Sequence, residues 1–261
     1  MNALFLGTGT STGVPMIGCH CPVCASTDPR DRRLRSGLLL RHNGFHLQID
    51  TSPDLREQVL RNNIERIDAV LLTHAHVDHL FGLDDLRRFN LVQKCAIPVY
   101  TTPEAIATIH RVFEYLFVPA LPGTFLPSLQ FCPIRAGEPF DVGPFRVTAF
   151  DVFHGLSRTV GYRIEAEGCA LGYACDCKVF PEEAYETVRG VDTMVLDALR
   201  LRPHPSHLSF EESRSVLQRI GARESYFTHL AHDLPHAELE TRFPPVKPAY
   251  DGLCVNICAH G

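Results

Sequence analysis

The sequence has no excess of positive charge, no long apolar run and no basic leader. Its 261 residues carry 25 Lys and Arg against 30 Asp and Glu, a net charge of −5. No global positive field therefore recruits nucleic acid, although local basic clusters can still bind phosphate. No apolar run reaches the roughly 18 to 20 residues that a membrane-spanning helix needs. The opening MNALFLGTGTSTG also lacks the basic region and apolar core of a signal peptide. We expect a cytoplasmic protein without a membrane partner.

Internal repeats and low-complexity segments are also missing from the sequence. Apolar residues make up 45% of the chain and charged residues 21%, which is ordinary for a globular protein. The length fits one large domain better than two small ones. We therefore predict a single domain over residues 1–261.

Short β-rich runs alternate with stretches of helical periodicity along the chain. The predicted strands cover residues 2–7, 36–42, 45–50, 68–74, 128–134, 144–153, 159–166, 169–176, 192–199 and 224–229. The predicted helices cover residues 52–63, 103–117, 181–190 and 210–220. This alternation indicates a layered α/β domain. The Pro-rich stretch 118–128 is the expected long loop, a lid or a joint between halves.

Three cysteines crowd the segment GCHCPVC, residues 18–24, which we call the knuckle. Cys19, Cys21 and Cys24 can supply three thiolates to one metal ion, and a tetrahedral zinc needs a fourth ligand. In a reducing cytosol such cysteines favour metal binding over disulfides. An iron–sulfur role is disfavoured because no fourth cysteine stands at cluster spacing. Cys175 and Cys177 are predicted to be small buried residues.

A second cluster, LLTHAHVDHLFGL, follows an apolar strand. It places His74, His76, Asp78 and His79 within six positions. Neutral imidazole and carboxylate are ligands for Zn²⁺, Mn²⁺ or Fe²⁺. Four ligand-type residues at the end of a buried strand predict a metal site.

The pattern H-x-H-x-D-H resembles the signature of the metallo-β-lactamase superfamily, and the likeness extends along nearly the whole chain. The resemblance implies an αββα sandwich with a dinuclear metal site at the edge of its two sheets. It also implies three further ligands at strand ends: a His, a bridging Asp and a final His. His154, Asp176 and His229 each close an apolar run in that order. Asp192 and Asp197 remain alternatives to Asp176.

The resemblance divides these residues between two divalent ions, Mn²⁺ or Zn²⁺. One ion would be held by His74, His76 and His154, and the other by Asp78, His79 and His229. Asp176 would bridge the two, and Asp50 would hydrogen-bond to a ligand histidine and orient it without binding a metal.

The opening GTGTSTGVP, the knuckle and the segment THLAH resemble one group in the superfamily, the PhnP-like phosphodiesterases. That likeness implies one structural zinc on Cys19, Cys21, Cys24 and His232. A Cys₃His site is closed, with no position left for substrate. His20 and His236 are the rival fourth ligands.

The resemblance further implies a reaction on small phosphodiesters, such as a ribosyl 1,2-cyclic phosphate or 2′,3′-cyclic nucleotides. A metal-bridging hydroxide would attack phosphorus, with Asp78 and Asp176 as the carboxylates of the catalytic site. His207, just before a predicted helix and close to His204, would protonate the departing alkoxide. The substrate phosphate would contact arginines drawn from Arg30, Arg32, Arg33, Arg35, Arg200 and Arg202.

The same sequence pattern is compatible with other functions. A tRNA 3′-end processing activity like that of the tRNase Z group shares the core and the histidine, but no long basic exosite arm is visible. Hydrolysis of lactams, thioesters or lactones uses the same metal core. An accessory or binding protein similar to PqqB would not need the complete ligand set. The resemblance also suggests a homodimer.

Overall fold

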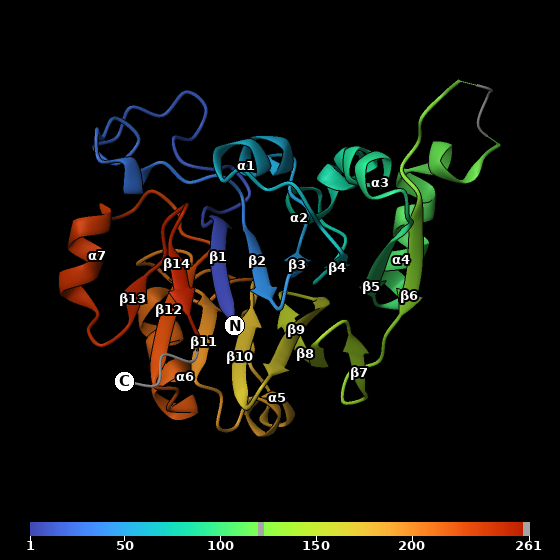
Figure 1. Ribbon diagram of the computed structural model, residues 1–261. Helices are drawn as coiled ribbons and strands as arrows, with labels where there is room; N and C mark the ends of the chain where they lie inside the picture. Colours follow the sequence, from blue (N-terminus) through green and yellow to red (C-terminus); the bar gives the residue numbers. More distant parts are fainter. Residues whose placement is uncertain (120–122, 258–261) are drawn as a thin grey trace.

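Two sheets of seven strands each, stacked face to face, form the centre of the protein (Figure 1). The computed structural model describes residues 1–119 and 123–257, so residues 120–122 of the expected loop 118–128 lie outside the described residues. In spatial order the first sheet contains β14 (Cys254–Asn256), β1 (Asn2–Gly7), β2 (Gly37–His42), β3 (Phe45–Ile49), β4 (Ala69–Leu71), β5 (Ile97–Thr101) and β6 (Leu129–Pro133). The second contains β13 (Lys247–Pro248), β12 (Glu224–Thr228), β11 (Thr193–Asp197), β10 (Cys169–Ala174), β9 (Ser157–Ala166), β8 (Phe145–His154) and β7 (Pro139–Val142).

Helices cover the outer face of each sheet. The first sheet is covered by α1 (Leu55–Arg61), α2 (Val77–Leu80), α3 (Arg87–Gln93) and α4 (Pro103–Val112), with the 3₁₀ turns η2 (Phe81–Leu86) and η3 (Glu114–Phe117). The second is covered by α5 (Glu182–Thr187), α6 (Phe210–Ile220) and α7 (His236–Arg242). The turn η1 (Pro29–Asp31) belongs to the long segment between β1 and β2.

Both faces of the central strands are buried, which is why their sequences read as nearly continuous apolar runs. In β1, Ala3 and Phe5 point into the core between the sheets, whereas Leu4 and Leu6 point under the helices. This alternation follows from the two-residue period of a strand. The expected αββα sandwich is confirmed.

The helix boundaries follow local capping chemistry. Ser209 and Glu212 form a capping box at the start of α6, and Gly221 ends the helix in the left-handed conformation. The helix predicted over residues 103–117 is split, because α4 ends at Val112 and a 3₁₀ turn follows. Between them Phe113 leaves the helical conformation and is buried in the helix-side core.

Strand direction brings the predicted site residues to one edge of the sandwich. In the first sheet β3 and β4 are parallel, and in the second β10, β11 and β12 are parallel. Two antiparallel steps through β9 make β8 run the same way as β10. The carboxyl ends of these strands therefore meet, and the sheets are joined there by bonds from Val160 N–H to the Thr73 carbonyl and from Tyr162 Oη to the Leu72 carbonyl.

In the described part of the chain, the longest apolar helices are too short to cross a lipid bilayer.

Candidate metal centre

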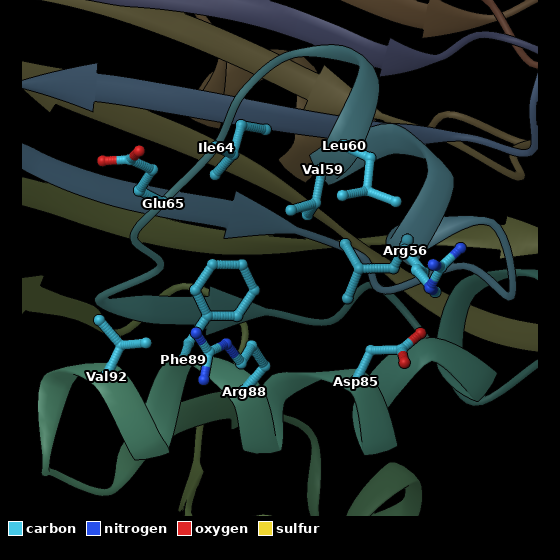
Figure 2. A pocket seen from close by; sticks show the side chains of 10 residues that line it. Arg56, Val59, Leu60, Ile64, Glu65, Asp85, Arg88, Phe89 and Val92 are labelled. Atoms are coloured by element: carbon cyan, nitrogen blue, oxygen red, sulfur yellow. The ribbon is translucent and has the colours of Figure 1, made fainter.

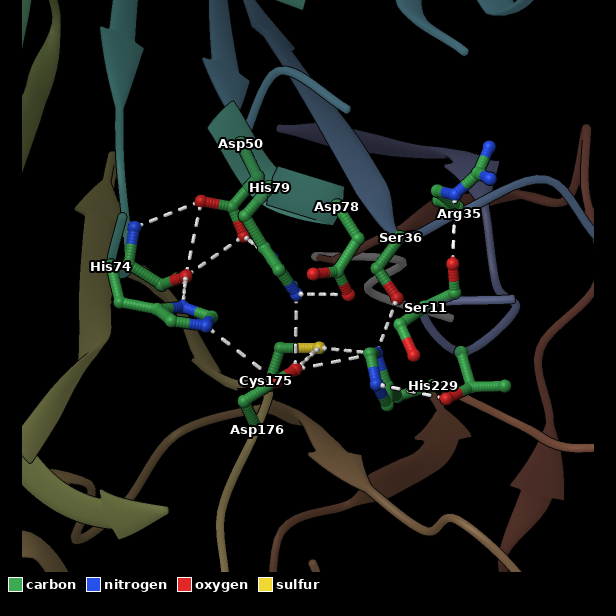
Figure 3. Close-up of polar contacts among 12 residues, drawn as sticks. Ser11, Arg35, Ser36, Asp50, His74, Asp78, His79, Cys175, Asp176 and His229 are labelled. Carbon is green, nitrogen blue, oxygen red and sulfur yellow. Dashed lines mark hydrogen bonds and ion pairs between the residues drawn. The ribbon is translucent and has the colours of Figure 1, made fainter. Parts of the chain in front are cut away.

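Asp176 lies at the centre of a cluster of histidine rings (Figure 3). Its Oδ2 atom is 3.6 Å from His74 Nε2 and 3.7 Å from His154 Nε2. Its Oδ1 atom is 3.1 Å from His79 Nε2 and 3.3 Å from His229 Nδ1. Each carboxylate oxygen thus faces its own pair of imidazoles, an arrangement that lets one carboxylate serve two ions.

His76 and Asp78 complete the cluster from the turn that follows β4. The exposed ring of His76 lies 4.4 Å from that of His74 and 5.2 Å from that of His154, measured between centroids. The Asp78 Oδ2 atom is 3.3 Å from His79 Nε2. The residues predicted for the two ions are therefore brought together on two sides of Asp176.

Hydrogen bonds to Nδ1 fix the orientation of two of these rings. The Asp50 carboxylate accepts a 2.7 Å bond from His79 Nδ1 and also accepts bonds from the N–H and hydroxyl of Thr73. The Thr73 hydroxyl in turn is 2.9 Å from His74 Nδ1. Asp50 therefore contacts a histidine as predicted, and the bonds leave both Nε2 atoms for the centre of the cluster.

His154 is held in the same way by the segment that carries His207. Its Nδ1 atom donates a 2.8 Å bond to the Ser206 carbonyl. This bond leaves His154 Nε2 facing Asp176 and ties the end of β8 to the turn before α6.

The donor set fits a pair of divalent ions. Among the described residues, the buried Nε2 atoms of His74 and His79 have no hydrogen-bond partner, and an unmade bond of a buried polar atom is costly. Burial and the neighbouring His79 lower the pKa of His74 well below its usual value, and burial lowers the pKa of His76. Both rings are therefore neutral, which is the form that binds metals.

Three residues of the cluster have strained backbone. Asp50, Asp176 and His229 adopt φ values of 58°, 51° and 59°, in the left-handed region that non-glycine residues rarely occupy. Such strain persists only where the surroundings impose it, and it concentrates at functional sites.

Asp176 rather than its two rivals occupies the centre. Asp192 precedes β11 and accepts a bond from Ala170 N–H at the start of β10, which places it at the opposite end of these strands. Asp197 ends β11 and accepts a 2.8 Å bond from His207 Nδ1.

His207 lies against the cluster and is held by Asp197. Its ring stacks on that of His229 at a centroid distance of 4.9 Å and lies 4.4 Å from that of His154. Asp197 is fixed in turn by a 2.8 Å bond from Cys177 N–H. Burial alone would lower the pKa of His207, but the charge and hydrogen bond of Asp197 raise it above the usual value. This imidazole is therefore able to carry a proton near neutral pH.

The knuckle gathers its three cysteines around His232. Atoms of Cys19, Cys21, Cys24 and His232 lie within 4.8 Å of one another, with Cys21 Sγ 3.2 Å and Cys19 Sγ 3.5 Å from His232 Nδ1. The contact with His232 and the N–H of Cys24 lower the pKa of Cys21 to about 6. The thiolate character of Cys21 and the convergence of the four groups fit a closed tetrahedral zinc site, whereas burial raises the pKa of the Cys24 thiol to about 11 in the absence of metal.

The two rivals of His232 lie elsewhere. His20 is exposed and does not belong to the cluster that the described residues form. His236 is buried at the start of α7, where its Nε2 atom is 3.4 Å from Glu240.

The knuckle is connected to the centre through a short segment. Leu230 N–H donates to the Thr8 carbonyl and Thr10 N–H donates to the Leu230 carbonyl, which forms a bridge between Gly9 and Leu230. On its other side Gly9 lies against the backbone of Arg33 and Leu34. A Cβ at Gly9 would lie 2.8 Å from the Arg33 carbonyl, so this approach of the Arg33 backbone requires glycine. His229 is therefore anchored on its C-terminal side, where Leu230 forms this bridge and His232 contacts the knuckle.

Two of the predicted phosphate-binding arginines are engaged with carboxylates. Arg30 pairs with Asp28 and Glu240 at 2.8 and 3.0 Å. Arg33 is fully buried beside Asp31 at 3.6 Å, so it is not open to a substrate phosphate in this conformation. A phosphate contact by Arg30, whose side chain stays partly exposed, remains a prediction, and the burial of Arg33 counts against the same role for Arg33.

The other four arginines are at least partly exposed. Arg35 is near the cluster, where its Nη1 atom is 2.9 Å from Asp54 and its Nε atom donates to the Ser11 carbonyl (Figure 3). Arg200 donates to the carbonyls of Arg202 and Pro203. Arg32 and Arg202 are exposed. A phosphate contact by Arg32, Arg35, Arg200 or Arg202 stays a prediction.

Sequence reasoning missed three contacts of His229. Ser36 Oγ lies 3.1 Å from its Nδ1 atom, Cys175 Sγ lies 3.4 Å from the same atom, and Thr10 Oγ1 lies 3.3 Å from its Nε2 atom. In the sequence, Thr10 stood out only as part of the GTGTS motif and was not predicted to contact His229. Ser36 and Cys175 carry no local signal, because their proximity depends on the packing of the sheets.

An apolar cavity of about 510 Å³ lies apart from this centre, between α1 and η2–α3 (Figure 2). It is lined by Leu55, Arg56, Val59, Leu60, Ile64, Glu65, Asp85, Arg88, Phe89 and Val92. Its lining includes no member of the histidine cluster, so we assign it no part in the metal centre.

Known proteins share this architecture. The model of a β-lactamase superfamily domain matches residues 46–230. A crystal structure of a diphosphatase from the PhnP family is 36% identical, with a TM-score of 0.89 over 98% of this chain and 97% of that one. Zinc-bound PqqB from Methylobacterium extorquens is 25% identical, with a TM-score of 0.82 over 98% of this chain and 100% of that one.

A curated octanoyltransferase from Porphyromonas gingivalis is 38% identical over 258 residues, which is 97% of this chain. The match takes in 51% of that protein, so the chain spans about half the length of this relative.

Replacing His232 by alanine should remove about one zinc equivalent per chain and lower the melting temperature, because the closed site loses its fourth ligand. The matched control is His20→Ala, which changes an exposed histidine inside the knuckle. Metal content by mass spectrometry and melting by circular dichroism measure both effects. Equal zinc content in His232→Ala and the wild type would contradict the assignment.

Proposed function

Because the chain belongs to the β-lactamase superfamily, we propose that it is a dinuclear metallohydrolase that cleaves small phosphodiesters. The observation that carries the proposal is the position of Asp176, whose two oxygens face separate sets of histidines while the His207–Asp197 pair adjoins them. The likeness to a PhnP-family diphosphatase at 36% identity supports the substrate class.

The proposed ligand sets follow the two sides of Asp176. His74, His76 and His154 would hold one divalent ion, and Asp78, His79 and His229 the other, with Asp176 shared. When bound, two such ions activate a water molecule and polarise a phosphoryl oxygen. A third ion, zinc, would be held by Cys19, Cys21, Cys24 and His232 in a structural role.

His207 would act as the general acid. Its Nδ1–H is held by Asp197, so that Nε2 carries the proton that can be transferred. As water oxygen forms its bond to phosphorus and the ester P–O bond breaks, this proton would pass to the departing oxygen. An alkoxide is a poor leaving group, so the transfer matters most for alkyl and ribosyl esters.

Small cyclic phosphodiesters, such as 2′,3′-cyclic nucleotides or a ribosyl 1,2-cyclic phosphate, are the proposed substrates. A net charge of −5 gives no general attraction for a tRNA. The name octanoyltransferase belongs to a protein about twice as long, so it assigns no activity to this chain. The cytoplasm is the proposed location, because thiolate ligands of zinc require reducing conditions.

The alternative is an accessory role like that suggested by the similarity to PqqB. An accessory protein would not require a proton donor. The pairing of His207 with Asp197, beside Asp176, favours the hydrolase.

Substituting His207 by alanine should reduce kcat/KM for a 2′,3′-cyclic nucleotide by roughly 10²–10⁴-fold, as expected for the loss of a general acid. Hydrolysis of bis(p-nitrophenyl) phosphate should fall much less, because p-nitrophenolate leaves without protonation. Both rates are measured on fully metal-loaded protein. Equal losses on the two substrates would contradict a role in proton donation, and no turnover of either by wild-type protein would contradict the phosphodiesterase proposal.

The Asp197→Asn variant should shift the alkaline limb of the pH profile of kcat/KM to lower pH. Burial lowers the pKa of His207, but the charge and hydrogen bond of Asp197 outweigh burial and raise it. Removing the charge of Asp197 should therefore lower the pKa of His207. A general acid works only while protonated, and activity is then lost at lower pH. Asp192→Asn, at the other end of β11, is the control. If the alkaline limb does not move in Asp197→Asn, the claim that Asp197 raises the pKa of the general acid His207 is contradicted.

A further inference from the structure

A cysteine lies beside the second metal position, immediately before Asp176. Cys175 follows β10 on the face that points between the sheets, in line with Leu171 and Tyr173, and it is fully buried. Figure 3 shows its sulfur directed toward His229.

The distances around this sulfur are those of a coordination group. Sγ is 3.3 Å from Asp176 Oδ1 and 3.4 Å from His229 Nδ1. One atom each of His79, Cys175, Asp176 and His229 lies within 4.8 Å of all the others. With Cys175 the ion would have five protein ligands, and sulfur and nitrogen bound to one zinc at angles of about 90° to 110° are roughly 3.1 to 3.6 Å apart, from bond lengths of roughly 2.3 and 2.0–2.1 Å.

A second observation marks the same place as a ligand site. His79 Nε2 is completely buried, and in the described part of the chain it has no hydrogen-bond partner. It faces Oδ1 of Asp176 at 3.1 Å, the same oxygen that Cys175 contacts. An orphaned imidazole nitrogen, a carboxylate oxygen and a thiol thus converge.

We propose that Cys175 supplies a thiolate ligand to the ion held by His79 and His229. The inference rests on the dinuclear centre proposed above, though not on its substrate. Binding releases the thiol proton to solvent, since a coordinating thiol is deprotonated outright. The site then consists of two unlike positions, one with nitrogen and oxygen ligands alone and one that also has sulfur.

The neighbouring Cys177 provides a comparison, because it is also buried beside Asp176 but its sulfur points to the other face of the sheet. It is equally buried, but it belongs to the helix-side core, and its Sγ atom is 3.6 Å from the Val179 carbonyl. The two cysteines therefore flank Asp176 with opposite orientations, and only the sulfur of Cys175 contacts the proposed ligands.

A thiolate changes which metal the position prefers. Soft sulfur ligands select zinc and cadmium, whereas manganese favours oxygen. The position of Cys175 should therefore bind zinc in preference to manganese. Replacing Cys175 by serine should reduce that preference by at least the ~10-fold that loss of an outer-shell partner costs in metal affinity.

Cadmium NMR of the fully cadmium-loaded protein tests the proposal directly, because each thiolate ligand moves a cadmium resonance strongly downfield. Wild-type protein should show the knuckle ion furthest downfield, the nitrogen–oxygen position furthest upfield, and one resonance between them. Cys175→Ser should move only the intermediate resonance upfield, and Cys177→Ser should leave all three in place. Serine retains a hydrogen-bond donor toward Asp176. If the thiol of Cys175 only stabilised the structure, the spectrum of Cys175→Ser would therefore match that of the wild type.

The wild-type spectrum decides the matter even if the serine variant does not fold. Two resonances of the dinuclear centre in the nitrogen–oxygen range would overturn the role of Cys175 and leave the proposed hydrolase intact. Binding of cadmium at the knuckle alone would overturn the dinuclear centre and, with it, this inference.

Discussion

A single buried carboxylate, that of Asp176, is the constraint on which the rest of the centre depends. It is 2% exposed, and a charge in that position is costly unless it is compensated. Burial alone would raise the pKa of Asp176, but the charges of His229 and His79 hold it well below its usual range. Four imidazoles face its oxygens: those of His74 and His79 lie beyond the end of β4 in the first sheet, and those of His154 and His229 lie at the ends of β8 and β12 in the second. Two divalent ions would complete the same compensation.

Hydrogen bonds and backbone contacts hold those imidazoles in place. Asp50 and the Ser206 carbonyl hold the rings of His79 and His154 by their Nδ1 atoms. His229 is anchored through the bridge at Leu230 and through His232 in the knuckle. The knuckle therefore braces His229 through His232, which would couple the proposed structural zinc to the proposed dinuclear centre.

Much of the fold could be predicted because central strands buried on both faces are apolar throughout, as in β1. The candidate ligands from His74 to His79 could also be predicted, because they fall within six consecutive positions. β5 was missed, since Ile97–Thr101 is short and contains Pro98. The burial of Arg33 and the direction of the Cys175 sulfur depend on contacts between distant segments, which no local pattern records. His207 was predicted from the resemblance of its position to the catalytic histidine of the PhnP-like group, whereas its pairing with Asp197 depends on how the turn before α6 packs against the end of β11.

Anomalous X-ray diffraction from crystals of the metal-loaded protein tests the central claim most directly. The account predicts two peaks on either side of the Asp176 carboxylate, about 3.5 to 4 Å apart as in two-metal hydrolases. It also predicts a third peak among Cys19, Cys21, Cys24 and His232. A single peak near the histidines, or a pair that Asp176 does not touch, would contradict the claim that this carboxylate organises the site.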